Sequence, residues 1–291
     1  MLAGMDERQE ESGAPALPRG VIVAATPLGN IDDASPRLRA ALAGADVVAA
    51  EDTRRTRALA AALGVEIRGR GVSNFDHNEA RRAETLLDAA RHGTVLVVTD
   101  AGMPVVSDPG LTLVDAALDA GVPVTCFPGP SAVPTALALS GLSVGRFIFD
   151  GFAPRKSGRR RSWLESLKGE RRAVCFFESP HRLAETLHDA AQVLGAQRRA
   201  VVCRELTKTH EEVVRGTLGE LAERADAGVL GEVTVVLDGS DVEEADVAGL
   251  VDAVLERVST GERLKAVCKD VAGAAGVSSR ELYEAALAAR G

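Results

Sequence analysis

The amino-acid sequence predicts an α/β protein made of two α/β domains followed by a small helical region. Three stretches carry this prediction, because each runs from a short apolar segment into a tight turn rich in glycine and proline: residues 21–30, 95–104 and 122–132. Such a run, followed by a helical pattern, is typical of a parallel sheet that presents backbone groups at the carboxyl ends of its strands. Three such ends in the first half of the chain predict a small-molecule pocket.

Apolar runs and helical patterns alternate through the first domain, which we expect to span residues 20–144. The predicted strands are 21–25, 46–50, 95–99 and 122–127, and the predicted helices are 36–43, 54–63, 79–92, 111–120 and 131–140. Ser35 and Pro36 make a good helix start, because the serine oxygen can cap a free N–H and proline fills the first turn, where no N–H is needed. The alternation predicts a mainly parallel sheet.

A second series of elements begins after the glycines of residues 141–151 and predicts a second α/β domain over 145–240. Its strands are expected near 147–152, 173–177, 200–204, 212–216 and 232–237, and its helices near 160–168, 181–194 and 218–227. Residues 241–291 read as helical, and the spacing from Leu264 to Ala289 resembles a helix-turn-helix. A small helical cap on the second domain explains that spacing equally well.

The overall composition indicates a globular protein of the cytoplasm. Residues 1–19 lack a basic region followed by an apolar one, so we expect a disordered tail rather than a signal peptide. No apolar run approaches the roughly 20 residues of a membrane span. The four cysteines stand far apart, three of them in apolar runs, which favours buried thiols and argues against a metal site.

The glycine and proline turns do not match the known phosphate-binding fingerprints. Neither G-x-G-x-x-G nor G-x-x-x-x-G-K-[ST] occurs at a strand end, which argues against nicotinamide, kinase and ATPase functions. Asp100 follows an apolar run directly, so its carboxylate can face the pocket and accept hydrogen bonds from an ammonium or hydroxyl group. It can equally cap the next turn as an Asx residue.

Charged residues follow several other predicted strands. Glu51, Asp52 and Arg54 come after the second strand, where Asp52 can also cap the next helix. His77 precedes another helix and can accept a proton, since its unperturbed pKa is about 6.5. Glu178 and the nearby His181 follow a strand of the second domain, so a cleft between the domains would be lined with polar groups from both sides.

A basic segment over residues 155–172 stands out in a chain whose net charge is −8. It holds eight basic residues, which are Arg155, Lys156, Arg159, Arg160, Arg161, Lys168, Arg171 and Arg172. Its acidic residues are Glu165 and Glu170. A solvated helix face is the usual explanation of such residues, but this density favours a segment that contacts nucleic-acid phosphates, with Arg155 to Arg161 as the binding residues.

Together these motifs resemble the tetrapyrrole methylase family, and within it the bacterial methyltransferases that act on a cytidine 2′-hydroxyl of small-subunit ribosomal RNA. The match covers about residues 20–240, with the motifs in family order. They are Thr26–Asn30, Ala50–Arg54, His77–Glu79, Asp100–Pro104, Pro128–Ala132, Glu178–Arg182, Arg204–Lys208 and Gly231–Glu232. Leu28 and Met103 depart from the family's frequent isoleucine and threonine.

The resemblance implies S-adenosylmethionine as cofactor in the cleft between the domains, ribosomal RNA or the small ribosomal subunit as partner, and a homodimer. By position, the cofactor contacts would be Pro27, Asp100, Met103, Ser131, Ala132, Phe177, Glu205 and Glu232. The sulfonium needs no metal, only an oriented site. The ribose hydroxyl needs a base, and the catalytic candidates are Glu51, Asp52 and His77 with Arg54 to orient them, or else Glu178 or His181.

Two alternatives remain at this point. A methylase of the same fold that acts on a corrinoid or porphyrin would share the cofactor pocket but has no evident need of the basic segment. A nucleic-acid-binding regulator would use the C-terminal helices and sense a ligand with its α/β part. The C-terminal region is not notably basic, which weakens independent DNA binding.

Overall fold

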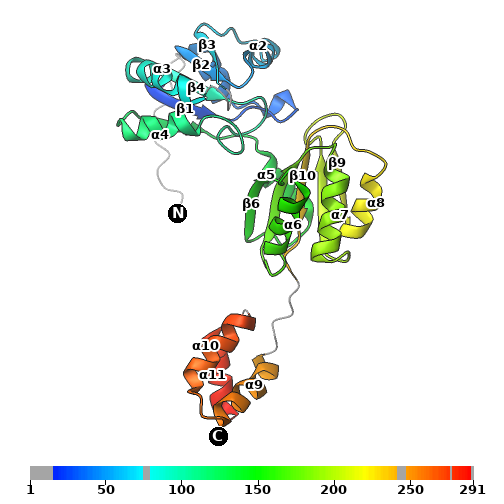
Figure 1. Ribbon diagram of the computed structural model, residues 1–291. Coiled ribbons are helices and arrows are strands. Elements are labelled where there is room, and N and C mark those ends of the chain that lie inside the picture. The colour runs from blue at the N-terminus through cyan, green and yellow to red at the C-terminus, as the bar shows by residue number, and fades with distance from the viewer. Residues whose placement is uncertain (1–15, 75–78, 241–246, 276, 290–291) are drawn as a thin grey trace, which may run out of the picture.

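Two five-stranded sheets, each with its own helices, precede a separate group of three helices in the computed structural model (Figure 1). The structure describes residues 16–74, 79–240, 247–275 and 277–289. No helix within these ranges is long and apolar enough to cross a membrane.

The first sheet is wholly parallel, as the βα alternation predicts. Its strands are β1 (Gly20–Ala24), β2 (Val47–Ala50), β3 (Arg70–Ser73), β4 (Thr94–Val98) and β5 (Val124–Phe127), in the order β3-β2-β4-β1-β5. Alternate strand residues face opposite sides, and the central strands β1, β2 and β4 bury side chains on both sides. Helices α1 (Pro36–Gly44) and α2 (Thr53–Ala62) cover one face, and α3 (Glu79–His92) and α4 (Leu111–Asp119) cover the other.

The second sheet is mixed. Its strands are β6 (Phe147–Phe152), β7 (Ala173–Glu178), β8 (Arg199–Arg204), β9 (Glu212–Thr217) and β10 (Val233–Leu237), in the order β6-β7-β10-β8-β9. Only β6 and β7 run parallel among these pairs. Helices α6 (Ser157–Ser166), α7 (Leu183–Leu194) and α8 (Leu218–Ala225) pack on one face.

Helix α5 (Ala132–Ser140) corrects the expected division of the chain at residue 144. Its buried Val133, Ala136 and Leu137 share a core with strand residues of the second sheet, such as Cys175 and Val236. The helical pattern of α5 is as predicted, but periodicity does not say which sheet a helix covers. The chain therefore crosses to the second sheet before α5, in the Pro128–Ser131 turn.

Local sequence explains where the helices begin. The Ser35 hydroxyl accepts a hydrogen bond from the Leu38 N–H at 3.0 Å, and Pro36 occupies the first turn of α1, as expected. Strand β3 was not predicted, because its sequence, Arg-Gly-Val-Ser, holds no apolar run. As an edge strand paired with β2 alone, it needs little apolar surface.

The C-terminal region is helical, as predicted. Helices α9 (Val247–Ser259), α10 (Leu264–Ala275) and α11 (Ser279–Ala288) share a core that includes Val254, Val267 and Leu282. Ser278 caps α11 by accepting a hydrogen bond from the Glu281 N–H.

Candidate functional site

A cleft of about 370 Å³ lies where the strand ends of the two sheets face each other. The first domain contributes Leu28, Glu51, Arg55, Thr99, Asp100, Ala101, Gly102, Met103, Val106, Ser107 and Asp108. The second contributes Ser131, Ala132, Phe152, Phe177, Glu178, Ser179, Pro180, Gly231, Glu232, Val233 and Thr234. The predicted pocket at the strand ends is thus present, and it is lined from both domains.

The cleft opens at the point of the first sheet where strand connections diverge. Strands β1 and β4 are neighbours, but the chain continues from β1 to β2 on one side of this pair and from β4, through α4, to β5 on the other side. Open α/β sheets bind ligands at such a point of divergence. Thr26 and Gly102, one from each connection, exchange backbone hydrogen bonds of 2.8 and 3.1 Å. Gly102 has a φ of 86°, and a Cβ there would lie 3.1 Å from the Leu28 side chain.

Two carboxylates, Glu51 and Asp100, form the polar wall on the first domain. Glu51 Oε2 accepts hydrogen bonds from the Thr99 hydroxyl at 2.7 Å and the Asp100 N–H at 3.3 Å. Asp100 accepts from the Asp52 N–H at 3.2 Å and lies 3.0 Å from Arg55 Nη1. Burial and the neighbouring Glu51 raise the pKa of the Asp100 carboxyl, and a cation bound beside it would lower that pKa again.

The opposite wall carries Glu178, whose carboxylate is fully buried. It accepts hydrogen bonds of 2.6 Å from the Ser179 N–H and the Thr186 hydroxyl, and it pairs with Arg182. These partners hold the turn after β7 in place. Glu178 is therefore a positioning group for the cleft wall, while His181 is exposed and is not among the residues that line the cleft.

Acidic side chains outnumber basic ones in the lining of the cleft. Glu51, Asp100, Asp108, Glu178 and Glu232 all belong to it, and Arg55 is the one basic residue among the described residues that line the cleft. Arg182 offsets Glu178 from behind the wall. The remaining charge favours a cationic ligand over an anionic one.

Most of the predicted cofactor contacts line the cleft: Asp100, Met103, Ser131, Ala132, Phe177 and Glu232. Pro27 and Glu205 are not among the lining residues. Glu205 supports the wall from behind, because its Oε1 accepts hydrogen bonds of 2.9 Å from the Glu232 N–H and from Lys208 Nζ. Lys208 also binds Glu232 Oε2 at 3.0 Å.

The predicted catalytic set is only partly brought together. Glu51 lines the cleft, but Asp52 caps α2 by accepting from the Arg54 N–H, and its carboxylate pairs with the Arg54 guanidinium at 2.9 Å. Hydrogen bonds from Arg54 hold the pKa of Asp52 well below its usual range, which makes it a weak base. Arg54 itself points to solvent, and the next residue, Arg55, reaches the cleft instead. His77 lies outside the described residues.

The basic segment also needs correction. Arg160 is buried, with its side chain 3% exposed, and lies 2.8 Å from Asp189 Oδ2. Arg161 lies 2.8 Å from the other oxygen of the same carboxylate. Both arginines tie α6 to α7, so Arg160 is not accessible to an RNA phosphate. Arg155, Lys156 and Arg159 are exposed and remain available.

Sequence reasoning missed several lining residues, among them Arg55, Thr99, Ser107 and Phe152. Arg55 stands beside a residue that was singled out, and only the helix geometry of α2 decides which of the two faces the cleft. Ser107 lies in the loop after Asp100, which the Gly/Pro pattern flagged without saying which side chains turn inward.

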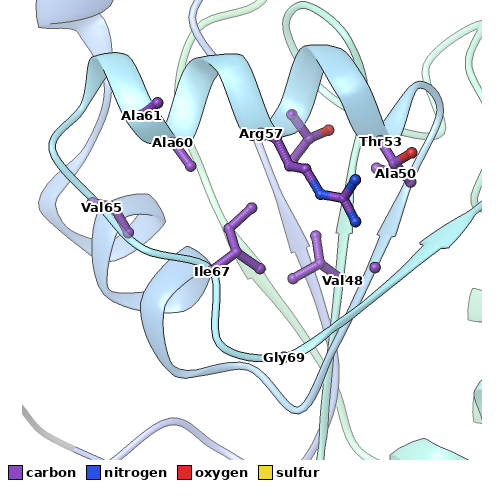
Figure 2. Close-up of a pocket in the computed structure, with 11 residues that line it drawn as sticks. Val48, Ala50, Thr53, Arg57, Ala60, Ala61, Val65, Ile67 and Gly69 are labelled. Carbon is purple, nitrogen blue, oxygen red and sulfur yellow. The ribbon is translucent and has the colours of Figure 1, made fainter.

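A second cavity, of about 190 Å³, lies under α2 (Figure 2). Figure 2 shows Arg57 directed from α2 toward the strands, with the apolar side chains of Val48 and Ile67 below it. No carboxylate, histidine or cysteine is among the described residues that line this cavity. It offers less chemistry than the cleft between the domains.

Comparison with known proteins agrees with this geometry. The family model of Tetrapyrrole (Corrin/Porphyrin) Methylases matches residues 20–222. Ribosomal RNA small subunit methyltransferase I of Mycobacterium tuberculosis is 59% identical over 272 residues, 93% of this chain and 95% of the relative. The protein of the same name from Thermotoga maritima is 42% identical over 223 residues, 76% of this chain and 99% of the relative.

Among solved structures, the fold resembles uroporphyrin-III C-methyl transferase from Thermus thermophilus complexed with S-adenyl homocysteine. The TM-score is 0.53 at 21% identity, and the match covers 75% of this chain and 97% of that one. The family model spans more than half of the sequence, and the relatives align over most of their length. This chain therefore belongs to the tetrapyrrole (corrin/porphyrin) methylase family.

Proposed function

We propose that this chain is an S-adenosylmethionine-dependent methyltransferase that methylates the 2′-hydroxyl of a cytidine ribose in small-subunit ribosomal RNA. The observation that carries the proposal is a separation of charge: the cleft is acidic, whereas exposed basic residues follow directly after one of the strands that line it. The cleft then suits a cationic cofactor, and the basic residues suit a polyanion. The names of the relatives from M. tuberculosis and T. maritima agree with this assignment.

The residues of the cleft fit S-adenosylmethionine. Asp100 offers a carboxylate to its positive charges, and the raised pKa of Asp100 reflects a site that a cation would stabilise. Phe177, Met103 and Ala132 offer apolar surface to a purine ring. The fold neighbour complexed with S-adenyl homocysteine supports the same choice.

When bound, the cofactor supplies a methyl group on a positively charged sulfur. The chain's task is to hold the ribose hydroxyl in line with that methyl group and to accept the hydroxyl proton as the C–O bond forms and the methyl–sulfur bond breaks. We assign proton acceptance to Glu51, the member of the predicted catalytic set that lines the cleft. The Thr99 hydroxyl and the Asp100 N–H fix the position of its carboxylate.

Arg155, Lys156 and Arg159 are the proposed phosphate contacts. They follow β6, whose carboxyl end carries the cleft residue Phe152, and all three are exposed. A hydrogen bond of 3.3 Å from Arg182 Nη1 to the Ala153 carbonyl ties the start of this segment to the wall of the cleft. RNA phosphates bound there would lie outside the acidic interior.

We further propose that the protein acts in the cytoplasm as a homodimer. Leu111 and Leu118 support a second subunit, because they lie seven residues apart on α4 and each is 61% exposed. Light scattering on the purified protein tests the assembly, with an expected mass of about twice the 30.3 kDa of one chain.

Methyl transfer to ribosomal particles tests the enzymatic proposal. Small subunits from cells that lack this protein are incubated with the enzyme and radiolabelled S-adenosylmethionine, and the 2′-O-methylated nucleotide is mapped by mass spectrometry of nuclease fragments. We expect one methylated cytidine ribose, and the variant Glu51→Gln should lower kcat far more than it lowers cofactor affinity.

A porphyrin or corrinoid acceptor provides the competing reaction in the same assay. Methyl transfer to such an acceptor without transfer to RNA would reject the proposed function in favour of a small-molecule methylase. Full activity of Glu51→Gln would reject Glu51 as the base.

A further inference from the structure

Strand β6 carries a bulge at the edge of the cleft. Phe149 pairs with Cys175 in regular register, but the next matched pair is Phe152 with Phe177, so β6 uses one residue more than β7 over this interval. Gly151 sits in the interval with a φ of 67°, a conformation that glycine adopts without strain. The bulge changes which face of the sheet the following residue occupies.

The bulge brings three phenylalanine rings together. Phe149 and Phe152 are three residues apart and would face opposite sides of a regular strand. Here both rings meet Phe177 edge to face, with centroid distances of 5.0 and 5.4 Å. Phe149 and Phe177 are partly buried in the core, whereas Phe152 is 57% exposed and lines the cleft. The cluster thus holds one ring in a fixed position with much of its surface open.

The residues around the Phe152 ring offer contacts that suit the phosphates and bases of a single RNA strand. Phe152 is followed within seven residues by the exposed Arg155, Lys156 and Arg159. From the first domain, Val106 and Ser107 line the same cleft, and a Cβ added to Gly151 would lie 3.4 Å from the Ser107 hydroxyl. The aromatic ring therefore lies between the cleft and the exposed basic residues.

We propose that Phe152 is a stacking platform for an unpaired nucleobase of the RNA substrate, presented by the β6 bulge at the mouth of the cleft. The proposal rests on the proposed function and adds the way in which the substrate strand is held. Proteins that bind single strands combine a positively charged track for the backbone with aromatic rings on which bases stack. Stacking of a base on Phe152 would bring its ribose to the cleft while the phosphates contact Arg155, Lys156 and Arg159.

Phe147 provides a matched control. It lies on the same strand, is 47% exposed and is not among the lining residues, so its truncation removes a similar apolar surface away from the cleft. The test compares Phe152→Ala, Phe152→Trp and Phe147→Ala with the unaltered protein. Binding is measured by fluorescence anisotropy with a labelled oligocytidylate of about twelve nucleotides, within the usual site size of single-strand binders. S-adenosylhomocysteine affinity is measured separately by calorimetry.

We expect Phe152→Ala to weaken oligonucleotide binding about 5- to 150-fold, the range for the loss of one base–aromatic stack. Phe152→Trp should retain binding, because tryptophan offers a larger ring. Phe147→Ala should stay within about twofold, since isolated surface changes have small effects. Neither alanine variant should alter cofactor affinity, and thermal melting confirms that each is folded.

Equal effects of Phe152→Ala and Phe147→Ala on RNA binding would overturn the platform and leave the proposed function standing. A parallel loss of S-adenosylhomocysteine affinity in Phe152→Ala would also overturn it, because the ring would then pack against the cofactor. Failure of the proposed function has a different signature: the unaltered protein would neither bind the oligonucleotide nor methylate small subunits, and both proposals would be rejected together.

Discussion

Asp100 shows how single residues set the chemistry of the cleft. Its carboxylate is partly buried beside that of Glu51, and the ion pair with Arg55 offsets only part of the cost of burial and repulsion. Repulsion between the two carboxylates destabilises the unliganded protein, and a bound cation relieves that repulsion. The carboxylate pair therefore lowers the stability of the fold and raises its affinity for a cationic ligand.

The first prediction concerns this carboxylate. Asp100→Asn should weaken S-adenosylmethionine binding about ten- to a hundredfold, as expected for the loss of a hydrogen bond to a charged group. Because the pKa of Asp100 is raised, the unaltered protein should lose affinity as the pH falls, at a pH above the usual range of aspartate. Calorimetry across pH should show that this loss is absent in Asp100→Asn. Unchanged affinity in the folded variant would return Asp100 to a turn-capping role.

The second prediction concerns the buried pair of Arg160 and Asp189. Burial alone would raise the pKa of Asp189, but hydrogen bonds from Arg161 and Arg160 more than offset this and lower it. A lowered pKa means that this contribution to stability is present above the ordinary pKa of aspartate and is lost as the pH falls through the folded-state pKa. Asp189→Asn should cost about 3 kcal/mol of stability at pH 7, because the buried Arg160 guanidinium then keeps only the exposed Glu185 carboxylate, 3.4 Å away, as a charged partner.

Denaturant unfolding measures this cost, and Arg159→Gln is the control. Arg159 lies next to Arg160 on α6 and is exposed, so its substitution should change stability by less than about 0.5 kcal/mol. Similar stabilities of the two variants would mean that the ion pair with Glu185 alone compensates the Arg160 charge.

At the scale of elements, the loop between β4 and α4 is held by a neighbouring helix. Glu79, the first residue of α3, accepts hydrogen bonds of 2.8 Å from the Gly110 and Thr112 N–H groups at the start of α4. The same loop contains Val105 with a φ of 74°, an outlying conformation for a β-branched residue. The Glu79 carboxylate thus caps α4 from outside and fixes a strained loop that lines the cleft.

The third prediction follows from this cap. Glu79→Ala should lower stability by about 1–2 kcal/mol, the cost of a lost helix cap, and should weaken cofactor binding through the loop. Hydrogen exchange of residues 103–112 should become faster. Glu84→Ala, an exposed position on the same helix, is the control and should leave all three measurements unchanged. Unaltered exchange in Glu79→Ala would show that the loop holds its conformation without the cap.

The elements also show how far the sequence predicts the structure. Strands with continuous apolar runs, such as β4, and helices with capped starts, such as α1, follow from local chemistry. The sheet to which α5 belongs does not, because its apolar face fits either core. The same limit applies to Arg160. The sequence of a basic helix predicts a nucleic-acid-binding surface, and it does not show that Asp189 of another helix pairs with Arg160.

For the whole molecule, the net charge of −8 leads us to expect that RNA binding depends on the exposed basic residues beside the cleft. RNA affinity should fall steeply with salt, by a slope of roughly −0.7 per phosphate contact. Replacing Arg155, Lys156 and Arg159 with glutamine should therefore flatten the slope by about two units and leave cofactor affinity unchanged. Replacing the exposed Arg263, Lys265 and Lys269 of the C-terminal region changes the net charge equally and is the control. Equal salt-dependence slopes for the two triple variants would show that Arg155, Lys156 and Arg159 do not contact RNA phosphates.

The last prediction concerns the C-terminal helices. Helices α9, α10 and α11 share a core of their own, and the family model ends at residue 222. The T. maritima relative is matched over 99% of its length by 223 aligned residues that cover 76% of this chain, so a protein of this kind exists in a shorter form. A chain truncated after Ser240 should therefore fold and bind S-adenosylmethionine within about twofold of the full chain.

Calorimetric unfolding provides the accompanying measurement. The main transition should persist in the truncated chain, because the two sheets keep their cores. Any transition at lower temperature should disappear, since a unit of about 45 residues is marginally stable alone. Loss of cofactor binding on truncation would instead show that the helices support the cleft. Retained cofactor binding with reduced methylation of small subunits would assign the helices to recognition of the ribosomal particle.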